Sequence, residues 1–152
     1  MAIAYLGLGT NIGNKRRNLI TAAALLAERA GDVLALSGFY QTEPWGFPSE
    51  NLFLNAAVTL ETELTPVELL QATRQIERDM GRTQKSAGSY QDRIIDLDIL
   101  LYGDLVLETP ELIIPHPLMH RRQFVLEPLA EIAPRAVHPV LKECITVLKE
   151  KL

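Results

Sequence analysis

The feature that most limits what this chain can fold into is the run at positions 93–102, Arg-Ile-Ile-Asp-Leu-Asp-Ile-Leu-Leu-Tyr. Its apolar, partly β-branched residues predict an interior strand. Residues i and i+2 of a strand point to the same face of a sheet. Asp96 and Asp98 therefore project side by side from a segment that is otherwise suited to burial. Two like charges placed so close together cost free energy unless something compensates them.

A divalent cation is the usual compensation for such a pair of carboxylates. Mg²⁺ is typically held by one or two carboxylates together with phosphate oxygens. Positive charge for those phosphates lies close by in the sequence, in Arg93 and in the segment Arg82-Thr-Gln-Lys85. The pattern predicts a metal and phosphate site. The alternative is a solvated edge strand that carries two acids, and the apolar residues on both sides argue against it.

The order of the remaining elements indicates the fold class. Thr65, Pro66 and Glu68 predict a helix start, with a capping threonine, proline in the first helical position and a glutamate that completes a capping box. Strand-helix-strand-strand-helix-strand is the order of the ferredoxin-like α+β fold, a single antiparallel sheet with helices packed on one face. A length of 152 residues predicts one domain over 1–152. The predicted elements are a strand over 3–9, a helix ending near 29, strands over 33–40 and 53–61, a helix over 66–80, a strand over 96–102, and shorter elements at 124–132 and 141–152.

Composition excludes several classes of protein. A net charge of −4, with the positive charge in local clusters, does not match the basic surface of a general nucleic-acid binder. The single cysteine, Cys144, allows neither an intrachain disulfide nor a Cys/His zinc cluster, and His138 before Pro139 is expected at the surface. No apolar run reaches the roughly 18 residues of a membrane span, and no signal peptide is visible. We expect a soluble cytoplasmic monomer that binds neither membrane nor nucleic acid.

Three further segments are candidates for binding. The glycines of Gly7-Leu-Gly9-Thr-Asn-Ile-Gly13 are spaced one residue too far apart for the dinucleotide-binding fingerprint, so we interpret them as serving a tight turn. The aromatic residues of the segment 42–55 suit a flat heterocycle whose edge an amide such as Asn55 can read, although these residues alone favour ordinary packing of aromatic side chains. Two histidines and two arginines within 116–122 can bind a phosphate by charge-assisted hydrogen bonds.

Several motifs occur together and in order along nearly the whole chain. They are Phe39-Tyr-Gln-Thr42, Phe53-Leu-Asn55-Ala-Ala, Ile76-Glu77 through Arg82, Arg93-x-x-Asp96-Leu-Asp98-Ile-Leu, Pro115-His116 and Arg122-x-Phe124. With these motifs the chain resembles the 6-hydroxymethyl-7,8-dihydropterin pyrophosphokinase family of folate biosynthesis. The resemblance implies a ferredoxin-like fold and transfer of the β,γ-pyrophosphoryl group of ATP to the hydroxymethyl group of the pterin, with release of AMP.

The resemblance also implies a role for each matching residue. It assigns catalysis to Arg82, Arg93, Asp96 and Asp98, with two Mg²⁺ ions held by the two aspartates. It assigns ATP binding to Glu77, Arg82, Arg93, Ile99, His116 and Arg122. It assigns pterin binding to Thr42, Glu43, Trp45, Phe53, Asn55 and Phe124.

Two other functions fit parts of the pattern. A regulatory module on the same fold would bind a nucleotide or pterin without turnover, but it has no need of two adjacent carboxylates. A metal-dependent nuclease or phosphatase would use the acid pair, but the net acidity and the aromatic segment 42–55 favour a small planar acceptor.

Overall fold

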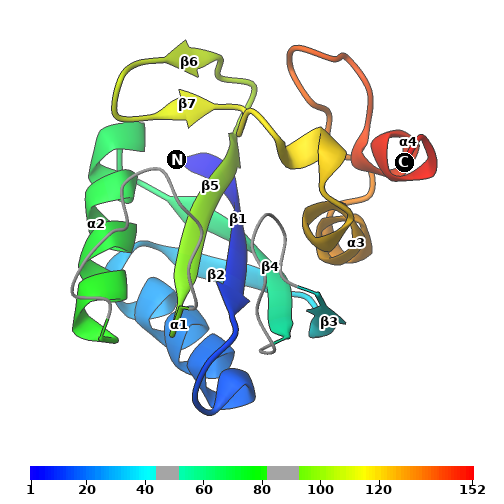
Figure 1. Cartoon of the computed structure of the whole chain (residues 1–152). Coiled ribbons are helices and arrows are strands. Elements are labelled where there is room, and N and C mark those ends of the chain that lie inside the picture. The colour runs from blue at the N-terminus through cyan, green and yellow to red at the C-terminus, as the bar shows by residue number, and fades with distance from the viewer. Residues whose placement is uncertain (44–51, 82–92) are drawn as a thin grey trace.

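The computed structural model describes residues 1–43, 52–81 and 93–152. Within these residues, five strands form one antiparallel sheet of order β2-β4-β1-β5, and β3 also pairs with β4 (Figure 1). This order, with β1 in the interior and β5 beside it, is that of the predicted ferredoxin-like fold, which is confirmed. The strands are β1 (Ala2–Thr10), β2 (Asp32–Leu36), β3 (Tyr40–Thr42), β4 (Phe53–Thr62) and β5 (Asp96–Tyr102).

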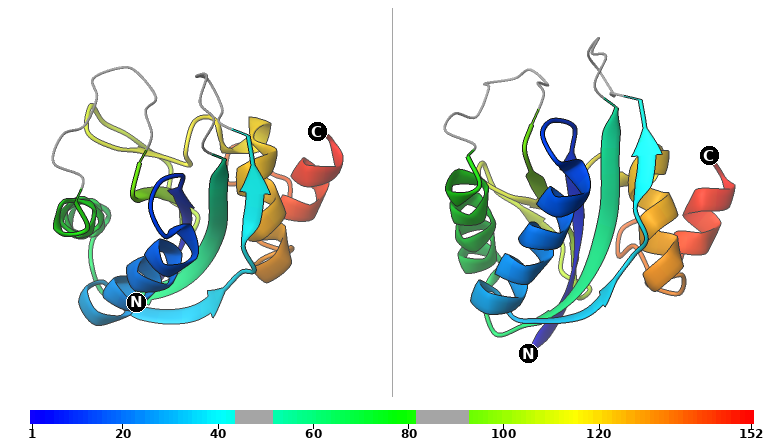
Figure 2. Two further views of the ribbon diagram at one scale, coloured as in Figure 1. Left: turned by 60° about the horizontal axis from the view of Figure 1, so that its bottom comes forward. Right: turned by 90° about the horizontal axis from the view of Figure 1, so that it is seen from below.

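Helices lie on both faces of this sheet. α1 and α2 cover one face, as the ferredoxin-like order predicts, whereas α3 and α4 lie on the opposite side (Figures 1 and 2). The expectation of helices on one face did not include this second layer, because the pattern of the C-terminal residues does not say which face they cover. Among the described residues, no helix is both long and apolar enough to cross a membrane. The remaining elements are α1 (Lys15–Arg29), α2 (Pro66–Asp79), β6 (Leu107–Glu108), β7 (Ile113–Ile114), a 3₁₀ turn (Met119–Arg121), α3 (Gln123–Ile132) and α4 (Ile145–Glu150).

Side chains at the ends of the helices explain where the helices begin. The Asn14 side chain accepts a hydrogen bond from the backbone N–H of Arg17 at the start of α1. At the start of α2 the Glu68 N–H donates to Thr65 Oγ1 over 3.2 Å, and the Thr65 N–H donates to Glu68 Oε1 over 2.9 Å. The capping box predicted from the sequence is therefore confirmed, and it satisfies backbone donors that the helix leaves without partners.

The segment predicted as one strand over 33–40 is divided in two. Ser37 lies between β2 and β3, and its hydroxyl accepts from the Ala57 N–H at 2.9 Å while donating to the Gly38 carbonyl at 2.7 Å. This side chain takes a place that main-chain pairing would otherwise fill. As a result, regular strand pairing resumes at Tyr40, where β3 begins and pairs with the first residues of β4.

Successive side chains of a strand point to opposite faces of the sheet, and this alternation separates two hydrophobic clusters. Ala4, Leu6 and Leu8 of β1 belong to the cluster beneath α1 and α2. Ala57 of β4 and Leu100 of β5 belong to the cluster beneath α3 and α4. Because the same sheet carries both clusters, each face is covered by a different pair of helices, and the ligand pocket described below lies on the α3 face.

His138 is buried, and the expectation that it lies at the surface is wrong. Only 5% of the residue is exposed. Its Nδ1 accepts hydrogen bonds from the backbone N–H groups of Leu141 at 3.1 Å and Val140 at 3.3 Å. Burial, and to a smaller extent the neighbouring His120, lower the pKa of His138 below the ordinary value of 6.5. The ring therefore holds a turn together as a neutral acceptor.

We predict that acid destabilises the protein partly through His138. In the unfolded chain this histidine takes up a proton near pH 6.5, whereas in the folded chain its pKa is lower. The unfolded state therefore binds the proton first, and stability falls as the pH drops below about 6.5. His138→Asn keeps a side-chain acceptor for the same turn and should flatten this fall. His138→Ala should cost about 1–3 kcal/mol at pH 7.5 and less at pH 5, because it also removes the group that titrates.

The measurement is urea unfolding of the three proteins at pH 5 and pH 7.5. His116 also has a lowered pKa, of about 4, so the slope should diminish in His138→Asn without vanishing. An unchanged slope in His138→Asn would contradict the assignment.

Candidate functional site

Strand pairing gathers the predicted site residues on one face of the sheet. Asp96 pairs with Gly9 of β1, and Gly9 pairs in turn with Asn55 of β4. Asp98 pairs with Gly7 in the same way. Because neither glycine has a side chain, an open space remains between the two carboxylates on one side and the side chains of β4 on the other.

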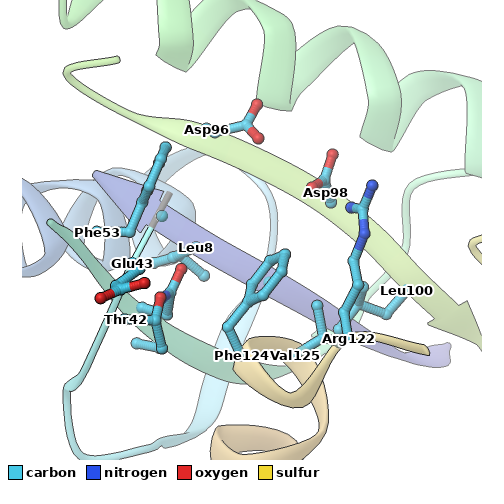
Figure 3. Close-up of a pocket in the computed structure, with 14 residues that line it drawn as sticks. Leu8, Thr42, Glu43, Phe53, Asp96, Asp98, Leu100, Arg122, Phe124 and Val125 are labelled. Atoms are coloured by element: carbon cyan, nitrogen blue, oxygen red, sulfur yellow. The ribbon is translucent and has the colours of Figure 1, made fainter. Parts of the chain in front are cut away.

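A pocket occupies this space. Its empty space of about 620 Å³ includes the part open to solvent. The aspartates lie along β5, and the rings of Phe53 and Phe124 stand on opposite sides of the pocket (Figure 3). Its lining consists of Gly7, Leu8, Gly9, Thr42, Glu43, Phe53, Asn55, Ala56, Asp96, Asp98, Leu100, Arg122, Phe124 and Val125.

The two aspartates form an electrostatically unfavourable pair. The pKa of Asp98 is raised to about 7, first by burial among protein atoms, then by the charge of Asp96 and that of Glu77. Arg122 and Arg74 act in the opposite direction but do not cancel these effects. The pair therefore concentrates negative charge that a bound cation would relieve.

These carboxylates fit Mg²⁺ on chemical grounds. Mg²⁺ keeps several waters and uses one or two carboxylates plus phosphate oxygens, so it does not need a cage made only of protein ligands. In residues 1–43, 52–81 and 93–152 no group of three or more His, Cys, Asp or Glu side chains forms a metal centre. Two adjacent carboxylates facing an open pocket agree with a metal that shares its ligands with a bound phosphate.

Arg122 brings positive charge to the same side of the pocket. The residue is only 6% exposed, and its Cζ lies 5.5 Å from the ring centre of Phe124. Figure 3 shows the guanidinium beside Asp98. Arginine in such a position can bind the oxygens of a phosphate while its plane remains against an aromatic ring.

The opposite side of the pocket can bind a planar, polar ring. Asn55 is 4% exposed, and its amide nitrogen donates to Thr42 Oγ1 at 2.8 Å and to the Tyr40 carbonyl at 3.5 Å. These bonds orient the amide so that Oδ1 lies toward Gly9, 3.2 Å from where a β-carbon would stand. A carbonyl oxygen beside two phenyl rings can accept from the N–H groups of a stacked heterocycle.

Glu77 lies outside the pocket lining. It is 2% exposed on α2, where its Oε2 accepts from the Leu97 N–H at 2.8 Å and its Oε1 from Arg74 at 3.2 Å. In the described part of the chain, β5 lies at the edge of the sheet. Glu77 therefore satisfies a main-chain donor of β5 and adds negative charge near Asp98.

His116 also lies outside the pocket lining, near Arg122 and Asp96. Its Nδ1 accepts from the Leu118 N–H at 3.3 Å, and the backbone N–H of His116 donates to the Leu100 carbonyl at 3.0 Å. Burial and Arg122 lower the pKa of His116 to about 4, with Asp96 opposing them. At neutral pH the imidazole is uncharged and carries its proton on Nε2, so it can donate a neutral hydrogen bond.

The structure brings together most, though not all, of the predicted residues. Ile99 is 4% exposed, and its side chain belongs to the cluster beneath α1 and α2, so a contact with ATP is open only to its main chain on β5. Arg93 precedes β5 and does not line the pocket. Trp45 and Arg82 lie outside the described residues. The predicted residues that line the pocket are Thr42, Glu43, Phe53, Asn55, Asp96, Asp98, Arg122 and Phe124.

Sequence reasoning missed the part played by the glycines. Gly7 and Gly9 belong to β1, as the strand predicted over 3–9 implies, and both line the pocket, whereas the glycine pattern was interpreted only as serving a tight turn. Their spacing of two within a strand was a signal that both lie on one face. The pairing of β1 with β5 decides which face the glycines share. The same pairing places Asp96 and Asp98 beside them.

Comparison with known proteins identifies relatives along most of the chain. Residues 5–134 match the family described as 7,8-dihydro-6-hydroxymethylpterin-pyrophosphokinase (HPPK). A 2-amino-4-hydroxy-6-hydroxymethyldihydropteridine pyrophosphokinase of Porphyromonas gingivalis is 51% identical over 141 residues, which are 91% of this chain and 95% of the relative. The Bacillus subtilis protein of the same name is 47% identical over 131 residues, which are 86% of this chain and 77% of the relative.

Solved structures agree on the fold. A Plasmodium falciparum HPPK-DHPS structure with pteroate superposes on 99% of this chain with a TM-score of 0.79 at 19% identity. This chain spans 42% of that longer one, and a likeness at such low identity concerns the fold alone. The match over 5–134 and the two bacterial relatives show more than the fold: the chain belongs to the 7,8-dihydro-6-hydroxymethylpterin-pyrophosphokinase family.

Proposed function

We propose that this protein transfers the β,γ-pyrophosphoryl group of ATP to the hydroxymethyl group of 6-hydroxymethyl-7,8-dihydropterin. The observation that carries the proposal is one continuous pocket with two chemically different sides. Asp96, Asp98 and Arg122 suit a metal-bound polyphosphate, and Phe53 and Asn55 suit a flat, hydrogen-bonding ring. A pocket of this kind holds the acceptor and the phosphate chain within reach of each other.

The pterin is proposed to lie between Phe53 and Phe124. Oδ1 of Asn55, which lies toward Gly9, would accept from N–H groups on the edge of the ring. Thr42 orients that amide through its hydroxyl, and Glu43 lines the same side of the pocket. Trp45 stays a predicted pterin contact.

The triphosphate is proposed to lie along β5. Asp96 and Asp98 would hold Mg²⁺, two ions by the family resemblance, and bound Mg²⁺ would neutralise phosphate charge and favour ionisation of the hydroxymethyl group. Arg122 would bind phosphate oxygens, and neutral His116 would donate a hydrogen bond. The roles of Glu77, Arg82, Arg93 and the Ile99 main chain in ATP binding stay predictions.

The reaction needs positioning more than covalent chemistry by the protein. The hydroxymethyl oxygen forms a bond with the β-phosphorus as the bond from that phosphorus to the bridging oxygen of AMP breaks. Holding the two reactants in line converts a bimolecular step into an effectively unimolecular one. Phe53, Phe124 and Asn55 would orient the acceptor, while Arg122 and Arg93 would balance charge that moves toward AMP.

The proposal is tested by a product assay. The protein is incubated with Mg²⁺, ATP and the reduced hydroxymethylpterin, and the nucleotides are resolved by chromatography. AMP that forms only with the pterin present supports pyrophosphoryl transfer. ADP would mean transfer of a single phosphoryl group, AMP or ADP without pterin would favour a hydrolase, and pterin binding without either product would favour a regulatory module.

Phe124→Ala should weaken pterin binding about 5- to 150-fold and ATP binding much less. Stacking of a base on an aromatic side chain is worth roughly 1–3 kcal/mol by alanine substitution, which gives this range. Titration calorimetry with each ligand measures the contrast. Phe124→Leu keeps an apolar side chain without a ring and should recover only part of the loss. A larger loss for ATP than for pterin would remove Phe124 from the pterin site.

Three wider expectations accompany this proposal. We propose that residues 1–152 act as one domain, since the two hydrophobic clusters share the same sheet. The dependence on Mg²⁺ is checked by repeating the product assay with a chelator. The cytoplasmic location and the monomeric state stay predictions, the second open to sedimentation measurements.

A further inference from the structure

The turn between β1 and α1, together with the first residue of α1, contacts the chain at two distant points beside the site. Asn11 bonds to Arg93, the first residue described after the segment 82–92. Lys15 Nζ donates to the carbonyl of Leu52, the first residue described after 44–51, at 3.1 Å. Leu52 immediately precedes β4 and Arg93 lies three residues before Asp96. The turn and the first residue of α1 therefore contact residues that come just before both strands that carry the pocket.

The link between Asn11 and Arg93 uses both polar groups of the arginine main chain. The Arg93 N–H donates to Asn11 Oδ1 at 2.6 Å, and the Arg93 carbonyl accepts from the Asn11 N–H at 3.0 Å. The Thr10 hydroxyl lies 3.5 Å from the same carbonyl as a weaker donor. With both groups hydrogen-bonded, the turn sets the position of the Arg93 backbone. It thereby also sets the direction in which the Arg93 side chain projects from the backbone.

The turn itself is rigidly supported. Asn11 is 1% exposed and Thr10 is fully buried. The Asn18 amide of α1 donates to Thr10 Oγ1 at 3.1 Å and to the Ile12 carbonyl at 3.0 Å. A buried amide whose neighbours are fixed on both sides has few alternative rotamers, so Asn11 acts as a firm reference point for Arg93.

We propose that Asn11 is a positioning residue for catalysis, acting through Arg93. This inference rests on the proposed function in one respect, because it takes Arg93 to balance charge on the phosphates. Asn11 does not line the pocket, so its effect on the reaction passes through the backbone that it holds. A displacement of about 1 Å in a charged group can cost about 100-fold in rate.

The first test follows the Arg93 amide and needs no activity. Asn11→Ala removes the acceptor, so exchange of the Arg93 amide proton, followed by NMR, should accelerate at least about 10-fold, the equivalent of one hydrogen bond of roughly 1.4 kcal/mol. Asn11→Asp keeps a side-chain oxygen and should restore most of the protection. Lys15→Met breaks the contact that the start of α1 makes with Leu52 and should leave the Arg93 amide protected. Equal exchange in the wild type and Asn11→Ala would overturn the proposal.

The second test separates positioning from general stability. Asn11→Ala should lower kcat about 10-fold or more in the wild-type background, with little change in pterin affinity, and should have almost no further effect in an Arg93→Ala background. Equal losses in the two backgrounds would show that Asn11 does not act through Arg93. If the wild type forms no AMP, the proposed function fails while the exchange test still judges the Asn11–Arg93 link.

Discussion

Asp98→Asn should nearly abolish formation of AMP while making the metal-free protein more stable. The substitution removes a negative charge that phosphate-bound Mg²⁺ needs, and the loss of one preorganised electrostatic group costs at least about 100-fold in kcat. The asparagine nearly preserves the shape of the side chain on β5. The fold should therefore remain, and the effect should lie in turnover with little change in the affinity for pterin alone.

The gain in stability follows from the raised pKa of Asp98. Unfolded aspartate releases its proton near pH 3.8, whereas in the folded protein the pKa of Asp98 is about 7. Between these values the folded state binds the proton more tightly, so the stability of the metal-free protein falls as the pH rises from about 4 to about 7. Asp98→Asn removes this fall. At pH 8 its Tm should exceed that of the wild type by several degrees, and at pH 4 the two should agree.

Calorimetric scans with and without Mg²⁺ provide the measurement. Mg²⁺ with a non-hydrolysable ATP analogue should raise the Tm of the wild type and do so much less in Asp98→Asn. Asp32→Asn is a matched control, because Asp32 is an exposed acid on β2 away from the pocket. Wild-type turnover in Asp98→Asn, or equal stabilisation of both proteins by Mg²⁺, would remove Asp98 from the metal site.

Gly9→Val should eliminate pterin binding and leave a well-folded protein. Gly9 lies in β1 with neighbours on both sides, where a β-branched residue suits the strand and glycine does not. A β-carbon at Gly9 would lie 3.2 Å from Asn55 Oδ1 and 3.6 Å from the Phe53 ring, in the space proposed for the pterin. The valine methyl groups would extend further into that space, so affinity should fall by about 100-fold or more, the scale of losing a stacked ring and its hydrogen bonds.

Gly7→Ala provides the graded comparison. The atoms nearest to a β-carbon there belong to the Leu100 side chain, the first at 3.6 Å, which is an ordinary van der Waals contact. Pterin affinity should therefore fall much less than in Gly9→Val. Circular dichroism and a Tm equal to or above that of the wild type would show that Gly9→Val has folded. Retained pterin binding in a folded Gly9→Val protein would mean that the ring lies elsewhere in the pocket.

Features that depend on neighbouring residues were predictable from the sequence. The capping box at Thr65 and Glu68 involves four consecutive positions, and the common face of Asp96 and Asp98 follows from the period of a strand. The order of strands and helices then led to the ferredoxin-like fold. The family motifs identified Phe53, Asn55 and Phe124 as binding residues. Residue type alone would not have shown whether these side chains bind a ligand or only pack in the interior.

Features that join distant parts of the chain were not predictable in this way. The pairing of Gly9 with Asp96 spans more than eighty positions, and the bond from Arg93 to Asn11 spans 82. Nothing in either local pattern states the register, because a shift of one residue would present the opposite face of each strand. The burial of His138 and the placement of α3 over Ala57 likewise depend on which surfaces meet.

The sequence by itself therefore determined the elements, the acid pair and the chemistry that such a pair can serve. The tertiary structure decided that two glycines open a pocket beside the aspartates, that Asn55 and Phe124 share it, and that a turn at Asn11 holds Arg93. The physical reason is one of range. Helix caps and strand alternation are set by interactions over a few residues, whereas the pocket exists only after strands far apart in the chain have paired and hydrophobic burial has fixed their register.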